Sequence, residues 1–288
     1  MGLMMNSKTI HFVTDSTCDL PPDVLAKYPI TVVPTYINYG DASYADDGKA
    51  LIREDFYNAL PGISPYPTTS AMSPGMAEAM VTAAFQGADH LFIITVASKL
   101  SAVYNTLKLG AHALPPDRVT LIDSQTLSFG LGFQVLIGAE IAAATGDVEA
   151  VHHAILQVQK HQRVFAALDT IKYLHLSGRI NWAAASLGNL LQIKPIIYVS
   201  AGEVRSASRV RTFSRALDEL VRLVSLQAPL DRITLLYAHE SEVLQQLHER
   251  LAPMVTNAIM SVSITPTIGV HTGPDGVGVV TLSSAWRE

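Results

Sequence analysis

Two serines beside a predicted helix start are the first residues in this chain that could do chemistry. Ser98 and Ser101 follow the apolar run Leu91–Val96, which is typical of a buried strand, and they precede a helical pattern that begins near Val103. Serine hydroxyls and the free N–H groups of a helix N-terminus can both donate hydrogen bonds to an anion. The stretch therefore indicates a site for a carboxylate or phosphate. The alternative is that both serines only cap the helix.

Two further polar stretches lie in the same half of the chain. Thr69 and Ser70 come just before a helix predicted to start at Pro74, where Ser70 or Ser73 can act as the N-cap. Residues 15–17 (Asp-Ser-Thr) follow the first predicted strand directly. They either line the mouth of a polar pocket or form a capped turn between a strand and a helix.

One histidine and two arginines stand out in the second half of the chain. His271 begins the stretch 271–278, whose glycines predict a loop and let a ligand approach the backbone. Its imidazole can donate to a carboxylate or phosphate, or it can serve a turn carbonyl. Arg179 and Arg211 can each form paired hydrogen bonds with an anion, dock a partner or join a structural ion pair. The arginines of 209–215 are predicted at a helix start.

Several motifs of catalytic and metal sites are absent from the sequence. There is no G-x-S-x-G nucleophile turn and no G-x-x-x-x-G-K-[ST] phosphate loop. His152 and His153 are adjacent rather than four residues apart, and Cys18 is the only cysteine. We therefore expect no metal, no cofactor and no intrachain disulfide. A single cysteine also favours a cytoplasmic location.

The composition favours a well-buried core over a nucleic-acid surface. Hydrophobic residues make up 49% of the 288 positions and charged residues 16%, with a net charge of −5. The negative balance disfavours nucleic acid as a partner. No apolar run approaches the roughly 18–20 residues that span a bilayer, and residues 1–10 lack the pattern of a signal peptide. The apolar bias fits either a large core or an apolar cavity.

Strands and helices alternate in the first half of the chain, which predicts a parallel α/β sheet. In such sheets ligands bind at the carboxyl ends of the strands, where the loops at residues 14, 98 and 124 can gather. A domain boundary is expected near residue 164. The predicted strands are 9–13, 30–38, 91–96, 119–123, 164–168, 194–199, 203–206, 232–237, 258–264 and 279–282. The predicted helices are 23–27, 53–60, 74–86, 103–114, 130–144, 146–162, a small-residue helix ending at 191, 215–225 and 241–252.

Taken together, these motifs resemble the DegV family of bacterial fatty-acid-binding proteins over nearly the whole chain. The order and spacing of the motifs carry the resemblance, because each of them is short. They are Thr14-Asp15-Ser16-Thr17, Asp19-Leu20, Thr69-Ser70, Ser98-Lys99-Leu100-Ser101 with Tyr104, Ile122-Asp123-Ser124, Ser128-Phe129-Gly130-Leu131-Gly132, Ser177-Gly178-Arg179-Ile180, Lys194-Pro195, Arg211-Thr212 and His271-Thr272-Gly273-Pro274.

The resemblance implies a fold of two α/β domains with the ligand between them. Residues 1–163 form the N-terminal domain, with a mostly parallel sheet and flanking helices. Residues 164–288 form the C-terminal domain, with a mixed sheet and helices. The segment near residues 50–70 is expected to pack with the second domain.

The resemblance also implies one bound long-chain fatty acid, such as palmitate, stearate or oleate, and no turnover by the protein alone. A separate fatty acid kinase subunit then uses ATP to convert the presented carboxylate into acyl-phosphate for phospholipid synthesis, with transient contact at the membrane surface. By motif position, the carboxylate-binding residues are Thr69, Ser101, His271, Ser70 and Ser98. Arg211 and Arg179 would contact the kinase or the new phosphate.

Two positions depart from the family pattern, and two rival functions stay open. Ala102-Val103 replaces Gly-Thr after Ser101, and Ala71-Met72 replaces Gln-Pro, so the preferred acyl chain and the carboxylate geometry are open. One rival function is a hydrolase or transferase that acts on an anionic ligand with Ser101 and His271. The other is a carrier of a polar, non-lipid ligand.

Overall fold

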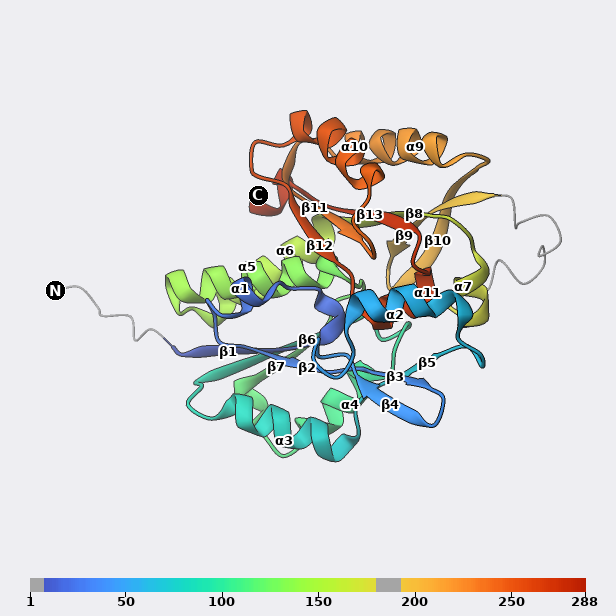
Figure 1. Cartoon of the computed structure of the whole chain (residues 1–288). Coiled ribbons are helices and arrows are strands. Elements are labelled where there is room, and N and C mark those ends of the chain that lie inside the picture. Colours follow the sequence, from blue (N-terminus) through green and yellow to red (C-terminus); the bar gives the residue numbers. More distant parts are fainter. Residues whose placement is uncertain (1–7, 180–192) are drawn as a thin grey trace.

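The computed structural model describes residues 8–179 and 193–288, which form stacked layers of helices and sheets (Figure 1). From one side to the other, the layers are α3 (Pro74–Phe85) with α4 (Val103–Gly110), sheet A, α5 (Phe129–Thr145) with α6 (Val148–His161), sheet C, and α9 (Phe213–Ser225) with α10 (Glu242–Leu251). The central helices α5 and α6 contact strands of sheet C, and α5 also contacts sheet A. They therefore join the two halves of the chain.

Sheet A is parallel, as the alternating pattern predicts. Its strand order is β2-β1-β6-β7, and every pairing is parallel. The strands are β1 (Ile10–Asp15), β2 (Ile30–Val33), β6 (His90–Thr95) and β7 (Val119–Asp123). All six residues of β6 are buried because helices cover both faces of the sheet. The loops after β1, β6 and β7 leave from the same edge.

Sheet C is mixed and mostly antiparallel. Its order is β10-β9-β8-β13-β11-β12, and β11 with β12 is a parallel pair. The strands are β8 (Gln162–Leu168), β9 (Lys194–Ser200), β10 (Glu203–Val210), β11 (Leu230–Tyr237), β12 (Met260–Ser263) and β13 (Gly276–Ser283). Helices α9 and α10 cover its outer face (Figure 1). The apolar face of α9 supplies Ala216, Leu217, Leu220 and Val224 to the core there.

A bend at Pro34 corrects one predicted strand. The predicted strand 30–38 is two strands, because β2 ends in sheet A and β3 (Tyr36–Tyr39) belongs to the small sheet B. Proline has no N–H for a ladder, so the chain can leave sheet A at this residue. The order of sheet B is β4-β3-β5, with β4 (Ala42–Ala45) and β5 (Thr68–Ser70), neither of which was predicted.

The segment between β4 and β5 contacts the second half of the chain. Helix α2 (Arg53–Ala59) packs against α11 (Pro266–Thr272), and Tyr57 Oη donates to the carbonyls of Ile264 and Thr265 at 3.0 Å each. The remaining elements are α1 (Pro22–Leu25), α7 (Lys172–Leu176), η1 (Ser16–Cys18), η2 (Leu60–Gly62), η3 (Pro116–Arg118), η4 (Ala252–Met254) and η5 (Ser284–Arg287). The domain boundary near residue 164 stays a prediction.

Two more sequence predictions need correction, and one lies outside the described residues. His271 is in the last turn of α11 rather than in a loop, because a helix precedes the glycines. Arg209 lies inside β10, so the arginine segment 209–215 runs from a strand into α9 rather than starting a helix. The small-residue helix predicted to end at 191 lies outside the described residues.

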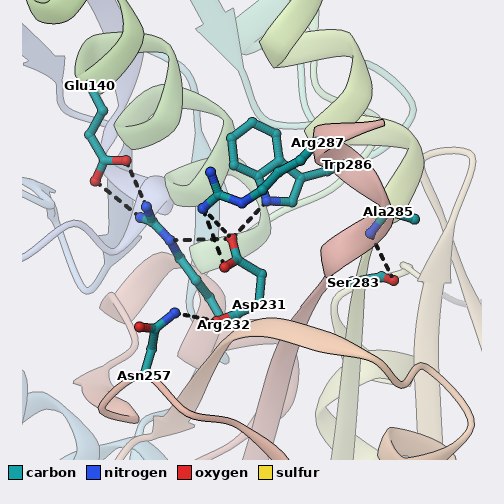
Figure 2. Close-up of polar contacts among 8 residues, drawn as sticks. All are labelled: Glu140, Asp231, Arg232, Asn257, Ser283, Ala285, Trp286 and Arg287. Carbon is teal, nitrogen blue, oxygen red and sulfur yellow. Dashed lines mark hydrogen bonds and ion pairs between the residues drawn. The ribbon is translucent and has the colours of Figure 1, made fainter.

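A polar cluster joins α5 to the start of β11 in sheet C (Figure 2). Arg232 donates two hydrogen bonds to Glu140, at 3.1 and 2.7 Å. The neighbouring Asp231 accepts from Trp286 Nε1 at 2.7 Å and from Arg287 at 3.0 Å. The Arg232 and Glu140 side chains are 25% and 32% exposed, so water screens this pair less than it screens a surface ion pair.

We expect Glu140→Gln to lower the free energy of unfolding by about 1–2 kcal/mol, because it removes a paired, partly buried charge-assisted contact. Urea denaturation measures the change. The matched control is Asp218→Asn, which weakens the pair between α9 and Arg250 of α10. The Asp218 side chain is 64% exposed, so this loss is expected to be less than about 0.5 kcal/mol. Equal losses for the two variants would contradict a special role for the α5–β11 contact.

Candidate functional site

A cavity of about 1050 Å³, including its open mouth, separates the carboxyl edge of sheet A from the inner face of sheet C. Its walls come from β8, β9, β11 and β13, from α11, and from the loops after β1, β6 and β7. Most of the lining side chains are aliphatic or aromatic. Its mostly apolar walls, with a few polar groups among them, suit an apolar ligand that carries one polar end.

Four of the seven predicted carboxylate-binding and kinase-contact residues line this cavity. They are Thr69, Ser101, Arg179 and His271. Thr69 Oγ1 and His271 Nε2 share a hydrogen bond of 3.2 Å. This contact joins β5 to α11 across 202 positions of sequence, and it places a hydroxyl and an imidazole at one polar end of the apolar cavity.

The imidazole of His271 is neutral over the ordinary pH range. Burial disfavours the imidazolium, and the nearby Arg179 guanidinium disfavours it further, so the pKa of His271 falls to about 3. Its Nδ1 is buried and has no hydrogen-bond partner among the described residues. A neutral imidazole can give one N–H to an anion. With a pKa near 3 it is a poor general base at neutral pH.

The backbone holds these side chains in place. The N–H groups of Leu100 and Ser101 both donate to the Ala97 carbonyl, which tightens the loop after β6, and Ser101 Oγ accepts from the Val103 N–H at 3.3 Å. On the other side, Tyr66 Oη donates to the Val270 carbonyl at 2.5 Å, next to His271. The polar end is therefore fixed from both halves of the chain.

Three predicted site residues lie outside the cavity lining. Ser98 is exposed and donates to Asp123 Oδ2 at 2.5 Å, so it is neither a cavity residue nor a helix cap. The residue at the N-cap position of α4 is Ala102, with no side-chain bond. Ser70 is exposed on β5, and Arg211 is exposed between β10 and α9. For α3, Ser73 is the N-cap, as one of the two predicted alternatives.

The acidic stretch after β1 forms the capped turn and also reaches the cavity. Asp15 accepts from the Thr17 N–H at 3.1 Å and from the Val96 N–H at 2.8 Å, and Thr17 lines the cavity. Asp19 accepts from Ser128 Oγ at 2.5 Å and from the Thr265 N–H at 2.8 Å. Burial raises the pKa of Asp15, and it raises the pKa of Asp19 to about 7.

Sequence reasoning did not assign Ser128 and Thr267 to the cavity, although both line it. Ser128 has a positive φ of 54°, which is unusual for a residue other than glycine, and its hydroxyl is bound to Asp19. Thr267 Oγ1 bonds Thr35 Oγ1 at 2.7 Å, across 232 positions. Ser128 begins one of the motifs that carry the family resemblance, and Thr267 lies two residues after Thr265, but neither signal pointed to the cavity.

The mouth of the cavity continues into a polar surface hollow. Leu100, Ser101, Arg179 and Val204 line both spaces. The rim also carries Lys99, which is paired with Glu203 at 2.9 Å. The side of the cavity at Ser101 and Arg179 is therefore next to solvent and to charged side chains.

Neither a metal cluster nor a membrane-spanning helix was found in the described ranges. Within residues 8–179 and 193–288 no group of three or more His, Cys, Asp or Glu side chains is arranged to hold a metal ion. No helix in these ranges is both long and apolar enough to cross a membrane.

Comparisons with known proteins find one and the same family over almost the full chain. A family model described as "Uncharacterised protein, DegV family" matches residues 9–284. A DegV domain-containing protein of Deinococcus radiodurans is 31% identical over 275 residues, which cover 94% of this chain and 97% of the relative. A DegV domain-containing protein of Streptomyces coelicolor is 30% identical over 283 residues, which cover 96% and 99%.

Solved structures show the same fold. The fatty-acid-binding DegV family protein from Thermus thermophilus superposes with a TM-score of 0.88 at 29% identity, covering 96% of this chain and 99% of that one. A stearic-acid-binding protein from Eubacterium ventriosum gives a TM-score of 0.86 at 20% identity, covering 97% of this chain and 100% of that one. At this identity the likeness shows only a shared fold.

Proposed function

This chain belongs to the DegV family, and on that basis we propose that it binds one long-chain fatty acid in the cavity between sheets A and C. The carboxylate lies at Thr69, Ser101 and His271, and the acyl chain runs along the apolar walls. The observation that carries the proposal is the pairing of Thr69 with His271 at the polar end of an otherwise apolar cavity. The fatty-acid-binding protein of Thermus thermophilus supports the same ligand class.

The physical chemistry of the cavity favours such a ligand. A palmitate tail buries about 14 methylenes, and at about 0.8 kcal/mol each the gross transfer free energy is on the order of 11 kcal/mol. The losses of translational and side-chain freedom reduce this value, but tight binding remains. Hydroxyl and imidazole donors satisfy the carboxylate, which would be costly to bury without partners.

The protein then presents the carboxylate to a separate ATP-dependent fatty acid kinase, which forms an acyl-phosphate for phospholipid synthesis in the cytoplasm. Ser101 and Arg179 line both the cavity and the surface hollow, so a partner can approach the carboxylate from this side. Arg179 lies at this mouth and could contact the new phosphate. The exposed Arg211 could contact the kinase.

Hydrolysis or transfer by Ser101 and His271 is the weaker alternative. Activating a serine needs a base whose pKa is near the working pH, and the pKa of His271 is about 3. His271 Nε2 is bonded to Thr69, while Ser101 Oγ accepts from the backbone of Val103. This geometry favours holding an anion over attacking a substrate.

Native mass spectrometry with lipid extraction tests the proposal. We expect a 1:1 mass increment that extracts as a C16 or C18 fatty acid. Ser101→Ala should weaken binding of that acid about tenfold, since one hydrogen bond to a charged group is lost. Ser98→Ala is the matched control, because Ser98 is a nearby serine outside the cavity, and it should bind like wild type. Protein that takes up no C14–C18 acid would rule out the proposal.

A further inference from the structure

One row of residues crosses the inner face of sheet C and changes sharply in size. The strand registers place Ile197 opposite Ala166, Ala166 opposite Gly278, and Gly278 opposite Leu236. All four residues line the cavity. The row therefore has a large side chain on β9, a methyl group on β8, no side chain on β13 and a large side chain on β11. Its two smallest residues are neighbours in the middle of the sheet.

Because Gly278 has no side chain, Leu236 can pack closely against the surface of the sheet at this position. A Cβ placed on Gly278 would lie 3.0 Å from Leu236 Cδ1 and 3.2 Å from the Phe165 carbonyl oxygen. Leu236 thus extends over the glycine and closes one side of the row. A side chain at 278 would require Leu236 or the backbone of β8 to shift by a few tenths of an ångström.

Ala166 is open to the cavity although it lies on a central strand. It is only half-buried, whereas its neighbour Ala167, on the opposite face of the same strand, is 0% exposed. Successive residues of a strand point to opposite faces, so Ala167 is packed under α9 and α10 and Ala166 faces the cavity. The open area at Ala166 is therefore cavity surface.

Larger residues bound the hollow toward the start of β8. Two positions before Ala166 on the same face, Val164 pairs with Val199 on one side and Val280 on the other. These valines belong to the core cluster that includes the buried residues of α5 and α6. Ala166, beside the glycine that Leu236 covers, thus leaves a hollow in the floor of the cavity, which we call the Ala166–Gly278 hollow.

We infer that the Ala166–Gly278 hollow sets the size of the acyl chain that the protein accepts, an inference that rests on the proposed function. With the carboxylate at Thr69 and His271, the chain must continue along the apolar floor. The hollow gives the acyl chain extra room at the centre of the sheet, and Ile197 and Leu236 lie on either side of that room. Filling the hollow removes room for methylenes without touching a polar donor.

Ala166→Leu tests the inference, because leucine adds three carbons to cavity space rather than to packed core. Delipidated protein is incubated with an equimolar set of C12, C14, C16 and C18 fatty acids, and native mass spectrometry reads the bound species. We expect the affinity for C18 to fall about 10- to 100-fold and the affinity for C12 to fall by a smaller factor, so that the preference moves toward shorter chains. The carboxylate variant Ser101→Ala should weaken all four acids alike.

The results of this experiment distinguish failure of the proposed fatty-acid binding from failure of the inference about the hollow. Wild-type protein that binds none of the four acids defeats the proposed function. Wild-type protein that prefers C16 or C18, with the same preference in Ala166→Leu, overturns the inference and leaves the proposed function intact. If the leucine variant does not fold, Ala166→Val decides, since valine suits a strand and adds two carbons. It should shift the preference in the same direction by a smaller factor.

Discussion

Gly269→Ala should lower the free energy of unfolding by about 3 kcal/mol or more, because no space exists for a methyl group there. A Cβ on Gly269 would lie 2.2 Å from Tyr57 Cε1 and 2.6 Å from Tyr57 Oη. The ring cannot swing aside, since Tyr57 is 1% exposed and its hydroxyl holds the carbonyls of Ile264 and Thr265. Either α2 or α11 must move.

The same substitution should also reduce fatty acid loading, because α11 carries His271 at its last turn. Urea denaturation and native mass spectrometry measure the two effects. Gly75→Ala is the matched control: a Cβ on Gly75 meets nothing within 4 Å, and alanine is the better helix former in α3. We expect that variant to be as stable as wild type or slightly more stable. Similar stability of the two alanine variants would show that Tyr57 does not lock α11 in place.

Much of the fold could be predicted because the strongest patterns are local. The apolar run 91–96 lies within one residue of β6, and the predicted strand 119–123 coincides with β7. Both are bounded by clear turn residues. The short strands β4 and β5 could not be found, since each has only three or four residues and pairs with β3 rather than joining a larger sheet. Their pairing depends on tertiary contacts that a local pattern does not contain.

The site is harder to predict because its contacts are long-range. Ser98 and Ser101 are three residues apart in one loop, and only the structure shows that Ser101 lines the cavity while Ser98 turns to Asp123. The contact between Thr69 and His271 spans 202 positions, and it was expected only through the family resemblance. Composition and periodicity contain no information about which distant loops meet.

Asp19 should make the protein less stable as the pH rises from 5 to 8. Its pKa is raised from 3.8 to about 7 because burial disfavours the carboxylate, while Arg53, Ser128 and Thr265 offset part of this cost and Asp46 adds to it. Between these two pKa values the folded protein holds a proton that the unfolded chain has released. Its contribution to stability is therefore complete below pH 3.8 and disappears as the pH passes 7.

The expected loss from Asp19 alone is about 2–3 kcal/mol between pH 5 and pH 8. Asp19→Asn should remove it, because an asparagine stays neutral, can accept from the Thr265 N–H and can donate to Ser128 Oγ. At pH 8 the variant should be more stable than wild type, and urea denaturation at pH 5, 6.5 and 8 gives the slope. Asp47→Asn is the control, since this carboxylate is bound at the surface to the N–H groups of Lys49 and Ala50. An unchanged slope in Asp19→Asn would mean that Asp19 is ionised in the folded protein across this range, with its charge balanced by Arg53 and its hydrogen bonds.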